Sequence, residues 1–303
     1  MKFLFALLPF VTIANSTFAA VFTNTADADD FVRSNSPTAN YGGAGALSVS
    51  GDSSTNTASG LTNGIADTFI RFNTTAMVTN LNSRFGTNNW VVTGAKLQLT
   101  EVATPIHPIF DQGQGAFAVF WIANDDWSEG TGTPNAPMTD GIAYNDEPVL
   151  LTNTAILGTF TNTGTDATLL LPLTLPAAFA GDTQAGGEVG FYLTAVDPNT
   201  GFTFYSRSFL TASLHPFLEI SAAPLPGISA ISLSGTNIVL LATNGAAGGT
   251  YYVLSSTNLL LPFDQWQPVA TTALSADGDF TITVTNAVNA GAPSQQFFIL
   301  QTQ

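Results

Sequence analysis

The chain has no cysteine, only six basic residues and almost no helical periodicity. Without cysteine it can form neither disulfide bonds nor a cysteine nucleophile, so burial of apolar side chains has to hold the fold. A serine nucleophile elbow, a phosphate-binding loop and a zinc-binding helix are also missing from the sequence. The scarcity of Lys and Arg excludes the clustered basic surface that nucleic acids require. We therefore expect neither an enzyme nor a nucleic-acid-binding protein.

Acidic residues dominate the few charges that are present. All 21 Asp and Glu residues and five of the six basic residues lie after residue 20, so that part carries a formal charge of −16. A surface of this sign repels acidic polysaccharides and anionic lipids. The partner expected is a neutral polysaccharide or another component of the cell surface.

The first twenty residues have the pattern of an export signal. Lys2 supplies the positive charge, residues 3–14 are largely apolar, and residues 16–20 are small enough for cleavage near Ala20. No later segment reaches the roughly 18 uninterrupted apolar residues of a membrane helix. The sequence thus predicts a signal peptide at 1–20 and a secreted or cell-surface protein whose mature chain is not inserted in a membrane.

Short runs with a period of two make up most of the remaining chain. In 95–102 and 280–285 apolar residues alternate with polar ones, as in strands that have one face on a core. The run 117–122 is apolar at every position, which predicts a strand covered on both faces. The pairs Asn63-Gly64 and Asp140-Gly141 favour the positive φ angles of tight turns. These features predict an all-β protein.

Two prolines within three residues mark a domain boundary. The segment APLPG at 223–227 interrupts the alternating pattern, and beyond it the chain has no Lys or Arg. We therefore expect a first domain at 21–223, a Pro-rich linker at 224–227 and a second domain at 228–303. About six short strands are expected in the second domain, enough for a small immunoglobulin-like β-sandwich, around Tyr251, Val253, Trp266, Phe280, Ile282 and Phe298.

Five segments of the first domain carry weak motifs in a recognisable order. They are 28–42 (ADDFVRSNSPTANYG), 67–77 (DTFIRFNTTAM), 92–99 (VTGAKLQL), 126–130 (DWSEG) and 202–222. Together they resemble the secreted DNRLRE family, which is related to carbohydrate-binding modules, although Asn73 stands where that family usually has Asp. The resemblance implies an antiparallel jelly-roll-like β-sandwich that commonly serves as a non-catalytic accessory module. Residues 248–269 are similar to a C-terminal module of large secreted proteins of environmental bacteria.

Aromatic and acidic residues are the candidates for ligand binding. Sugar rings stack on planar side chains, and four aromatic residues are expected in loops: Tyr41, Trp90, Trp127 and Tyr144. Trp127 has an alternative role as a wedge that packs its loop against the sheet.

Calcium is a candidate stabilising ion because it binds six to eight oxygen atoms. Six carboxylates are candidate ligands: Asp125, Asp126, Glu129, Asp140, Asp146 and Glu147. Asp27, Asp29 and Asp30 form a second candidate group. The alternative is that these side chains are solvated or cap turns.

Three arginines are expected to form structural ion pairs: Arg33, Arg71 and Arg207. On its strand Arg71 shares a face with Phe69, whereas Ile70 and Phe72 take the other face. Its guanidinium should therefore be partly buried and needs a carboxylate or carbonyl partner near an acidic loop.

A secreted, non-catalytic binding module for carbohydrate is the function that the sequence favours. A structural or adhesive protein of an extracellular surface is the alternative, since composition suits both. A polysaccharide-degrading enzyme is less favoured, because hydrolysis needs two carboxyls at a defined separation across one sugar bond. His107 and His215 each precede a proline and are expected to be structural.

Overall fold

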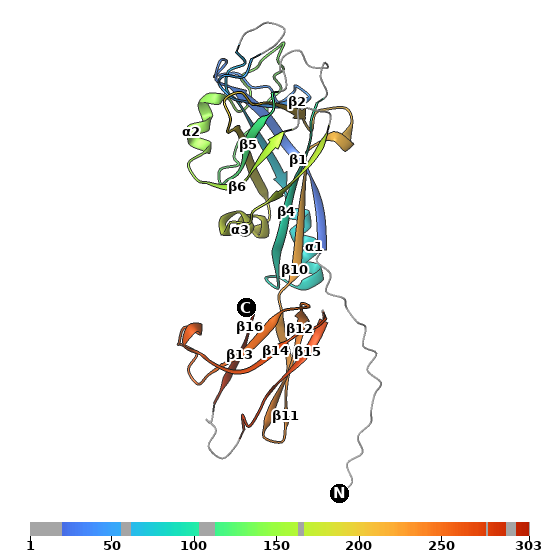
Figure 1. Cartoon of the computed structure of the whole chain (residues 1–303), viewed down its shortest axis with the longest axis vertical. Helices are drawn as coiled ribbons and strands as arrows, with labels where there is room; N and C mark the ends of the chain where they lie inside the picture. Colours follow the sequence, from blue (N-terminus) through green and yellow to red (C-terminus); the bar gives the residue numbers. More distant parts are fainter. Residues whose placement is uncertain are drawn as a thin grey trace. The chain divides into compact units, whose positions relative to one another are not determined.

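The computed structural model describes two compact β units, Ala20–Ala222 and residues 223–303 (Figure 1). The described residues are 20–55, 62–102, 113–162, 167–276, 278–288 and 295–302. Residues 1–19 of the expected signal peptide and His107 lie outside them. The expected linker is shorter than 224–227, because strand β10 (Phe217–Pro224) ends and strand β11 (Gly227–Ser234) begins within it. No helix in the described part of the chain is both long and apolar enough to cross a membrane.

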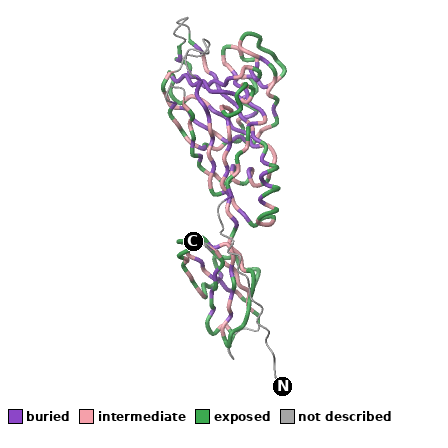
Figure 2. Tube along the Cα trace, turned by 90° about the vertical axis from the view of Figure 1, so that its right-hand side faces the viewer, coloured by how far each residue is buried: buried purple, intermediate pink, exposed green. Residues whose placement is uncertain are grey.

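The described residues of the first unit form ten strands. They are β1 (Ala20–Arg33), β2 (Ala46–Ser50), β3 (Ala66–Asn73), β4 (Trp90–Thr100), β5 (Gly115–Ile122), β6 (Thr154–Asn162), β7 (Thr168–Leu173), β8 (Glu188–Ala195), β9 (Gly201–Tyr205) and β10. Hydrogen-bonded neighbours follow the order β6-β5-β8-β3-β1-β10-β4-β7, and β2 joins β3 to β9. Figure 2 shows buried residues concentrated along these strands.

The long strand β1 belongs to both layers of the unit. Its residues 20–25 pair with β10, whereas 26–33 pair with β3, and the register shifts between Ala26 and Ala28. An irregularity of this kind bends a strand, so β1 passes from one sheet to the other. The result is the antiparallel jelly-roll-like sandwich that the sequence predicts.

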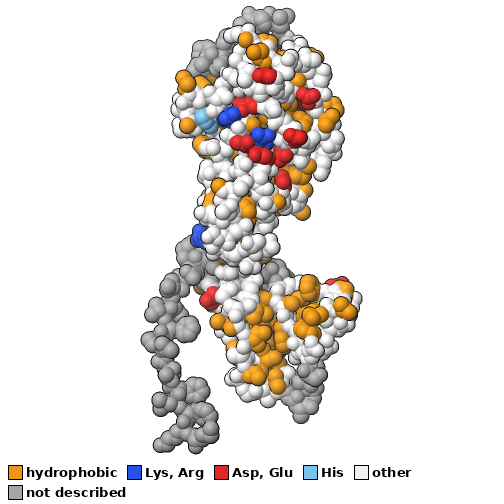
Figure 3. Space-filling view, turned by 180° about the vertical axis from the view of Figure 1, so that it is seen from behind, with side chains coloured by type: hydrophobic (Ala, Val, Ile, Leu, Met, Phe, Trp, Pro, Cys, Tyr) orange, Lys and Arg blue, Asp and Glu red, His pale blue; other side chains and the backbone are white. Residues whose placement is uncertain are grey.

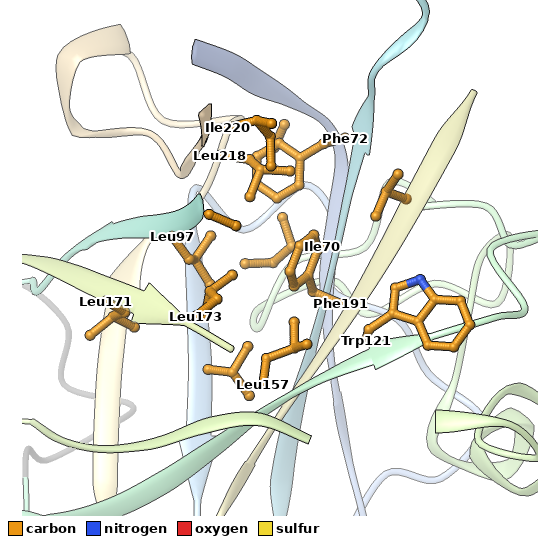
Figure 4. Close-up of a cluster of buried hydrophobic side chains, with 14 of the residues drawn as sticks. Ile70, Phe72, Leu97, Trp121, Leu157, Leu171, Leu173, Phe191, Leu218 and Ile220 are labelled. Atoms are coloured by element: carbon orange, nitrogen blue, oxygen red, sulfur yellow. The ribbon is translucent and has the colours of Figure 1, made fainter. Parts of the chain in front are cut away.

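An apolar core fills the space between the layers. In Figure 4, Ile70 and Phe191 of one layer face Leu97 and Leu218 of the other. The alternation expected at 95–102 is confirmed over 95–99, where Ala95, Leu97 and Leu99 are buried between half-buried polar residues, but it ends there, because residues 100–102 are all buried. Strand β5 is covered on both faces, as expected: Phe117, Val119 and Trp121 join this core, whereas Ile122 joins a second cluster on the opposite face of the sheet.

Three α-helices were not expected from the sequence: α1 (Thr75–Phe85), α2 (Glu147–Leu150) and α3 (Ala177–Ala185). Helix α1 starts two residues after β3, inside the segment 67–77 that reads as one strand motif. Met77, Val78 and Leu81 lie on its buried side and pack on the core. Its exposed side is filled by Thr and Asn, which conceal the helical period.

One of the expected tight turns has a different geometry. Gly64 has a φ of +73°, as the pair Asn63-Gly64 predicts, but Gly141 is not among the residues with positive φ. A Cβ at Gly141 would lie 2.6 Å from the Gly130 backbone nitrogen and 2.7 Å from the Glu129 carbonyl oxygen. Glycine is therefore needed at 141 for the close approach of two loop segments.

In the described part of the second unit, six strands form two three-stranded sheets, as expected for a small immunoglobulin-like sandwich. They are β11, β12 (Asn237–Gly245), β13 (Thr250–Ser256), β14 (Gln267–Ala273), β15 (Gly278–Val284) and β16 (Phe297–Thr302). One sheet has the order β11-β12-β15 and the other β14-β13-β16. Phe280, Ile282 and Val284 are buried while the threonines between them are exposed, which confirms the alternation at 280–285.

Replacement of Phe191 by Ala tests the core of the first unit. Phe191 is fully buried against Phe72 and Phe179, so the change leaves a cavity and should lower the free energy of unfolding by about 3–5 kcal/mol. Urea denaturation followed by tryptophan fluorescence measures this. Leu210→Ala is the matched control, because Leu210 is 99% exposed and its truncation should cost under about 0.5 kcal/mol. Equal costs for the two variants would contradict the assignment.

Candidate functional site

The segment between β5 and β6, residues 123–153, covers the outer face of strands β1, β3, β5 and β8, and we call it the covering loop. Its side chains Trp127 and Leu150 pack with Val32, Phe69 and Tyr192 of the strands in one buried cluster. Figure 3 shows acidic side chains gathered around basic ones on the surface of this unit. The covering loop and its polar contacts to the sheet therefore form the region where functional residues meet.

Arg71 fastens the covering loop to the sheet. Its Nη1 donates to the backbone carbonyl oxygens of Asp125 at 3.0 Å and Trp127 at 2.9 Å. Its Nη2 lies 3.1 Å from Asp27 Oδ2 and its Nε lies 3.2 Å from Glu188 Oε2. The side chain is only 20% exposed, and the guanidinium lies 5.2 Å from the centre of the Trp127 ring. The ion pair expected for Arg71 is present, on the strand face that it shares with Phe69.

Arg207 makes a second link between the covering loop and the sheets. Its guanidinium forms an ion pair with Glu129, with Nε donating at 2.8 Å to Oε2. Its backbone N–H donates to Asp29 Oδ2 at 2.7 Å. Arg33 donates from Nη2 to the carbonyl oxygen of Asn63 at 3.0 Å, so the structure gives it a carbonyl acceptor. His215 Nε2 lies 2.6 Å from the Phe209 carbonyl oxygen, within the first unit.

Three of the four aromatic candidates, Tyr41, Trp90 and Trp127, are buried. Tyr41 is 3% exposed and stacks on Phe31 with the ring centres 4.7 Å apart. Trp90 is the first residue of β4 and is 3% exposed, and its Nε1 donates to Asn82 Oδ1. The expectation that these rings form a sugar-stacking platform is wrong, because the fold turns their faces inward.

Trp127 and Tyr144 lie in or against the covering loop. Trp127 is 8% exposed and packs edge-on against Phe69, so its role as a wedge between loop and sheet is the one observed. Its indole Nε1 is buried and has no hydrogen-bond partner among the described residues. Tyr144 is half-buried in the short helix η1 (Tyr144–Asp146) and packs on the same cluster.

The six candidate calcium ligands do not converge. Asp140 accepts hydrogen bonds from Asn40 and Thr131, and Asp146 accepts one from the backbone N–H of Ala143. The others face different directions. Asp125 lies next to Arg71, Glu129 forms an ion pair with Arg207, Glu147 contacts Asp67, and Asp126 lies in the covering loop. Asp27, Asp29 and Asp30 are likewise directed to Arg71, Arg207 and the backbone N–H of Tyr41. Within the described ranges, no three acidic or histidine side chains are placed to hold a metal ion.

Asp67 and Glu147 form a buried carboxyl pair beneath the covering loop. Both side chains are under 10% exposed, and they hydrogen-bond to each other beside Tyr192. Burial, together with the charge of Asp67, raises the pKa of Glu147 to about 9, and burial also raises the pKa of Asp67. The pair therefore holds a proton at neutral pH, which allows both carboxyls to remain inside.

An open depression of about 610 Å³ lies in the covering loop. It is lined by Asn124, Asp126, Trp127, Ser128, Thr139, Asp140, Gly141, Ile142, Asp146, Val149 and Leu150. Four of the predicted residues therefore line the same depression: Trp127, Asp126, Asp140 and Asp146. The hydroxyl, amide and aliphatic lining residues were missed, because nothing in their local pattern distinguishes them from other loop residues.

Asp140 is anionic at the rim of this depression. The hydrogen bonds from Asn40 and Thr131 lower the pKa of its carboxyl to about 2. Among the described residues that line the depression three are acidic and none is basic, and the nearby guanidinium of Arg71 is engaged by Asp27 and Glu188.

No family model matches the chain, and no curated protein matches it. A search of solved structures finds a β-glucuronidase from Ruminococcus gnavus, 8% identical, covering 95% of this chain and 43% of that one, with a TM-score of 0.25. A β-D-glucuronidase of Dictyoglomus thermophilum is 9% identical, covering 95% and 42%, with a TM-score of 0.24. The chain spans less than half the length of either structure, and TM-scores this low carry no conclusion about fold or activity.

Replacement of Arg71 by Lys tests the attachment of the covering loop. A lysine keeps the charge but cannot hydrogen-bond to two carboxylates and two carbonyl oxygens at once. The free energy of unfolding of the unit should therefore fall by about 1.5–3 kcal/mol. Hydrogen exchange should rise in residues 123–153 before it rises in the strands. Lys96→Ala is the control, because its ion pair with Glu219 is 44% exposed on the lysine side and is worth at most about 1 kcal/mol. Arg71→Lys would contradict the proposal if its exchange pattern matched that of the control.

The buried carboxyls predict a stability that falls as the pH rises. Burial raises the pKa of Asp29 to about 8, and the pKa values of Asp30 and Glu147 to about 9. Between about pH 4.5 and these values the folded state binds more protons than the unfolded state, so the free energy of unfolding decreases with pH. We expect the highest thermal midpoint near pH 4–5 and a steady decline towards about pH 9.

Glu147→Gln separates the carboxyl pair from the other groups in this pH dependence. The variant removes one titrating group while it keeps the side-chain shape, so the slope of stability against pH should become shallower between about pH 5 and 8. Asp52→Asn, at an exposed position, should leave the slope unchanged. Parallel curves for wild type and Glu147→Gln would show that the pair does not share a proton.

Proposed function

We propose that the protein is an exported, non-catalytic binding module that holds a neutral carbohydrate in the depression of the covering loop. Export rests on the signal-like pattern of residues 1–20, and the carbohydrate class rests on the chemistry of the depression together with the resemblance to the DNRLRE family. The ligand site is the loop depression, not a platform of exposed aromatic rings.

The size and lining of the depression support this proposal. Its volume of about 610 Å³ falls within the range of sites for small ligands. Val149, which is 64% exposed, supplies apolar surface for the C–H faces of a sugar, with the buried Ile142 and Leu150 behind it, whereas carboxylates accept hydrogen bonds from its hydroxyl groups. The lining thus offers both kinds of contact that a neutral sugar makes.

The single observation that carries the proposal is the indole of Trp127. A buried N–H group without an acceptor costs free energy, and native proteins seldom leave one unpaired. Trp127 Nε1 is such a group, and the residue lines the depression. Because Nε1 is itself shielded from solvent, a sugar hydroxyl reaches it only when the loop residues around the indole move aside. That hydroxyl can then accept from Nε1 while donating to a carboxylate, which matches the dual role of a sugar hydroxyl.

The charge of the depression supports a neutral ligand over an acidic one. Asp126, Asp140 and Asp146 line it, whereas the nearby Arg71 is already paired with Asp27 and Glu188. The chain after residue 20 also carries a formal charge of −16. Uronic acids and sulfated sugars would meet repulsion from both sources.

The arrangement of the acidic groups supports binding without turnover. Glycoside hydrolysis needs two carboxyls separated by several ångströms with the sugar bond between them, and one of them must carry a proton. Asp67 and Glu147 share a proton but bond directly to each other, and neither lines the depression. Asp140 does line it, but its lowered pKa keeps it ionised.

Affinity electrophoresis and calorimetry with a panel of polysaccharides test the proposal. We expect binding to one class of neutral glycan and no release of reducing ends. Trp127→Phe keeps an aromatic wedge but removes the N–H donor, so affinity should fall by about 3–10-fold. Asp126→Asn should weaken binding by a similar factor, whereas Asp52→Asn, outside the depression, should not change it.

Three results would contradict the proposal. Binding that prefers acidic glycans or amines would show that the charge argument is wrong. Sugar binding unaffected by both Trp127→Phe and Asp126→Asn would place the site elsewhere. Product formation from any polysaccharide would show that the protein is an enzyme.

A further inference from the structure

Strand β11 exposes two apolar side chains on the core face of its sheet. Ile231 pairs with Leu240, and Leu233 pairs with Ile238, so each pair shares one face. Leu240 and Ile238 are 0% and 8% exposed, whereas Ile231 is 60% and Leu233 67% exposed. The inner face of the sheet is therefore covered over β12 but left open over β11.

The open edge of β11 lacks the usual protection of edge strands. Among the described residues β11 has one neighbouring strand, β12, so its other side presents backbone N–H and C=O groups. Residues 230–234 (AISLS) contain no charge and no proline, and the register irregularity lies before them, between Ile228 and Ala230. Natural proteins normally block such an edge with Lys, Pro or a bulge, because it accepts another strand.

We propose that β11 pairs antiparallel with β11 of a second copy of this chain, about a two-fold axis at Ser232. In this register Ile231 of each copy lies opposite Leu233 of the other, so both exposed apolar residues gain an apolar partner. An axis at Ile231 would place Leu233 opposite Ser229 instead, and an axis at Leu233 would place Ile231 opposite Gly235. The axis at Ser232 is the one that makes the patch complementary to itself, as a two-fold interface requires.

The distribution of charge favours a second copy over a charged partner. Residues 223–303 contain no Lys or Arg, and their acidic residues are only Asp264, Asp277 and Asp279. None of these lies in β11, whereas the other acidic residues belong to the first unit. Two copies can thus meet at β11 without placing like charges opposite each other, and a charged peptide would find no counter-charge in the strand.

Sedimentation equilibrium of the full chain, expressed with its own leader so that any export processing takes place, tests the pairing. Between about 10 and 500 µM we expect the weight-average mass to rise towards twice the monomer value, as for a small and weak interface. Ile231→Lys with Leu233→Lys should remain monomeric, because the register brings like charges face to face. Leu260→Lys is the matched control, since Leu260 is 91% exposed in the same unit but outside β11, and it should dimerise like the wild type.

A charge-exchange variant tests the register itself. Ile231→Lys combined with Leu233→Glu would place an ammonium group opposite a carboxylate twice in each dimer, so dimerisation should return and weaken with salt. The thermal midpoints of both double variants should stay near that of the wild type, because the replaced side chains are exposed in the monomer. A wild-type chain that stays monomeric to about 500 µM, a dimer that survives the double lysine variant, or a charge-exchange variant that fails to dimerise would each overturn the proposal.

Discussion

The position of the covering loop in the first unit is set by one interaction: the largely buried guanidinium of Arg71 needs hydrogen-bond acceptors. A guanidinium that is largely buried has to satisfy its N–H groups with carboxylates or carbonyls, and Arg71 does so with Asp27, Glu188 and two carbonyl oxygens of the covering loop. Because those carbonyls belong to Asp125 and Trp127, the same contacts set the position of Trp127 and of the depression beside it. Arg71 thus holds the covering loop, which has little regular structure of its own, in a fixed position on the sheet.

Local pattern was enough to predict the strands and the environment of Arg71. Alternation at 95–99 and 280–285 reports burial of every second residue, and an arginine next to Phe69 on one strand face has to lie against that face. Helix α1 escaped the prediction because Thr and Asn occupy much of its exposed side and only four apolar residues, Met77, Val78, Leu81 and Phe85, face the core. Short amphipathic helices of this kind are stabilised by tertiary packing and not by their own sequence.

The roles of the candidate site residues could not be predicted because their partners are distant in the chain. Asp140 is held by Asn40, 100 residues away, and Glu129 by Arg207, 78 residues away. Each such contact converts a potential metal ligand into a structural acceptor, and no local pattern contains it. The same applies to Trp90, whose aromatic ring reads as exposed until the helix that supplies Asn82 is known. The sequence shows which acidic and aromatic residues could bind a ligand. Hydrogen bonds to residues far away in the chain decide which of these side chains are free to do so.

The two units cover their sheets in different ways. In the first unit a loop of the same chain folds over the outer sheet face, and its buried carboxyls and arginine are compensated within that unit. In the second unit the described residues leave Ile231 and Leu233 of β11 open, although their neighbours on β12 are part of the core. An apolar strand edge that its own chain does not cover is stabilised when another strand adds to it. Since the acidic residues are concentrated in the first unit, a neutral edge in the second unit is where a copy of a highly acidic protein can approach with the least repulsion.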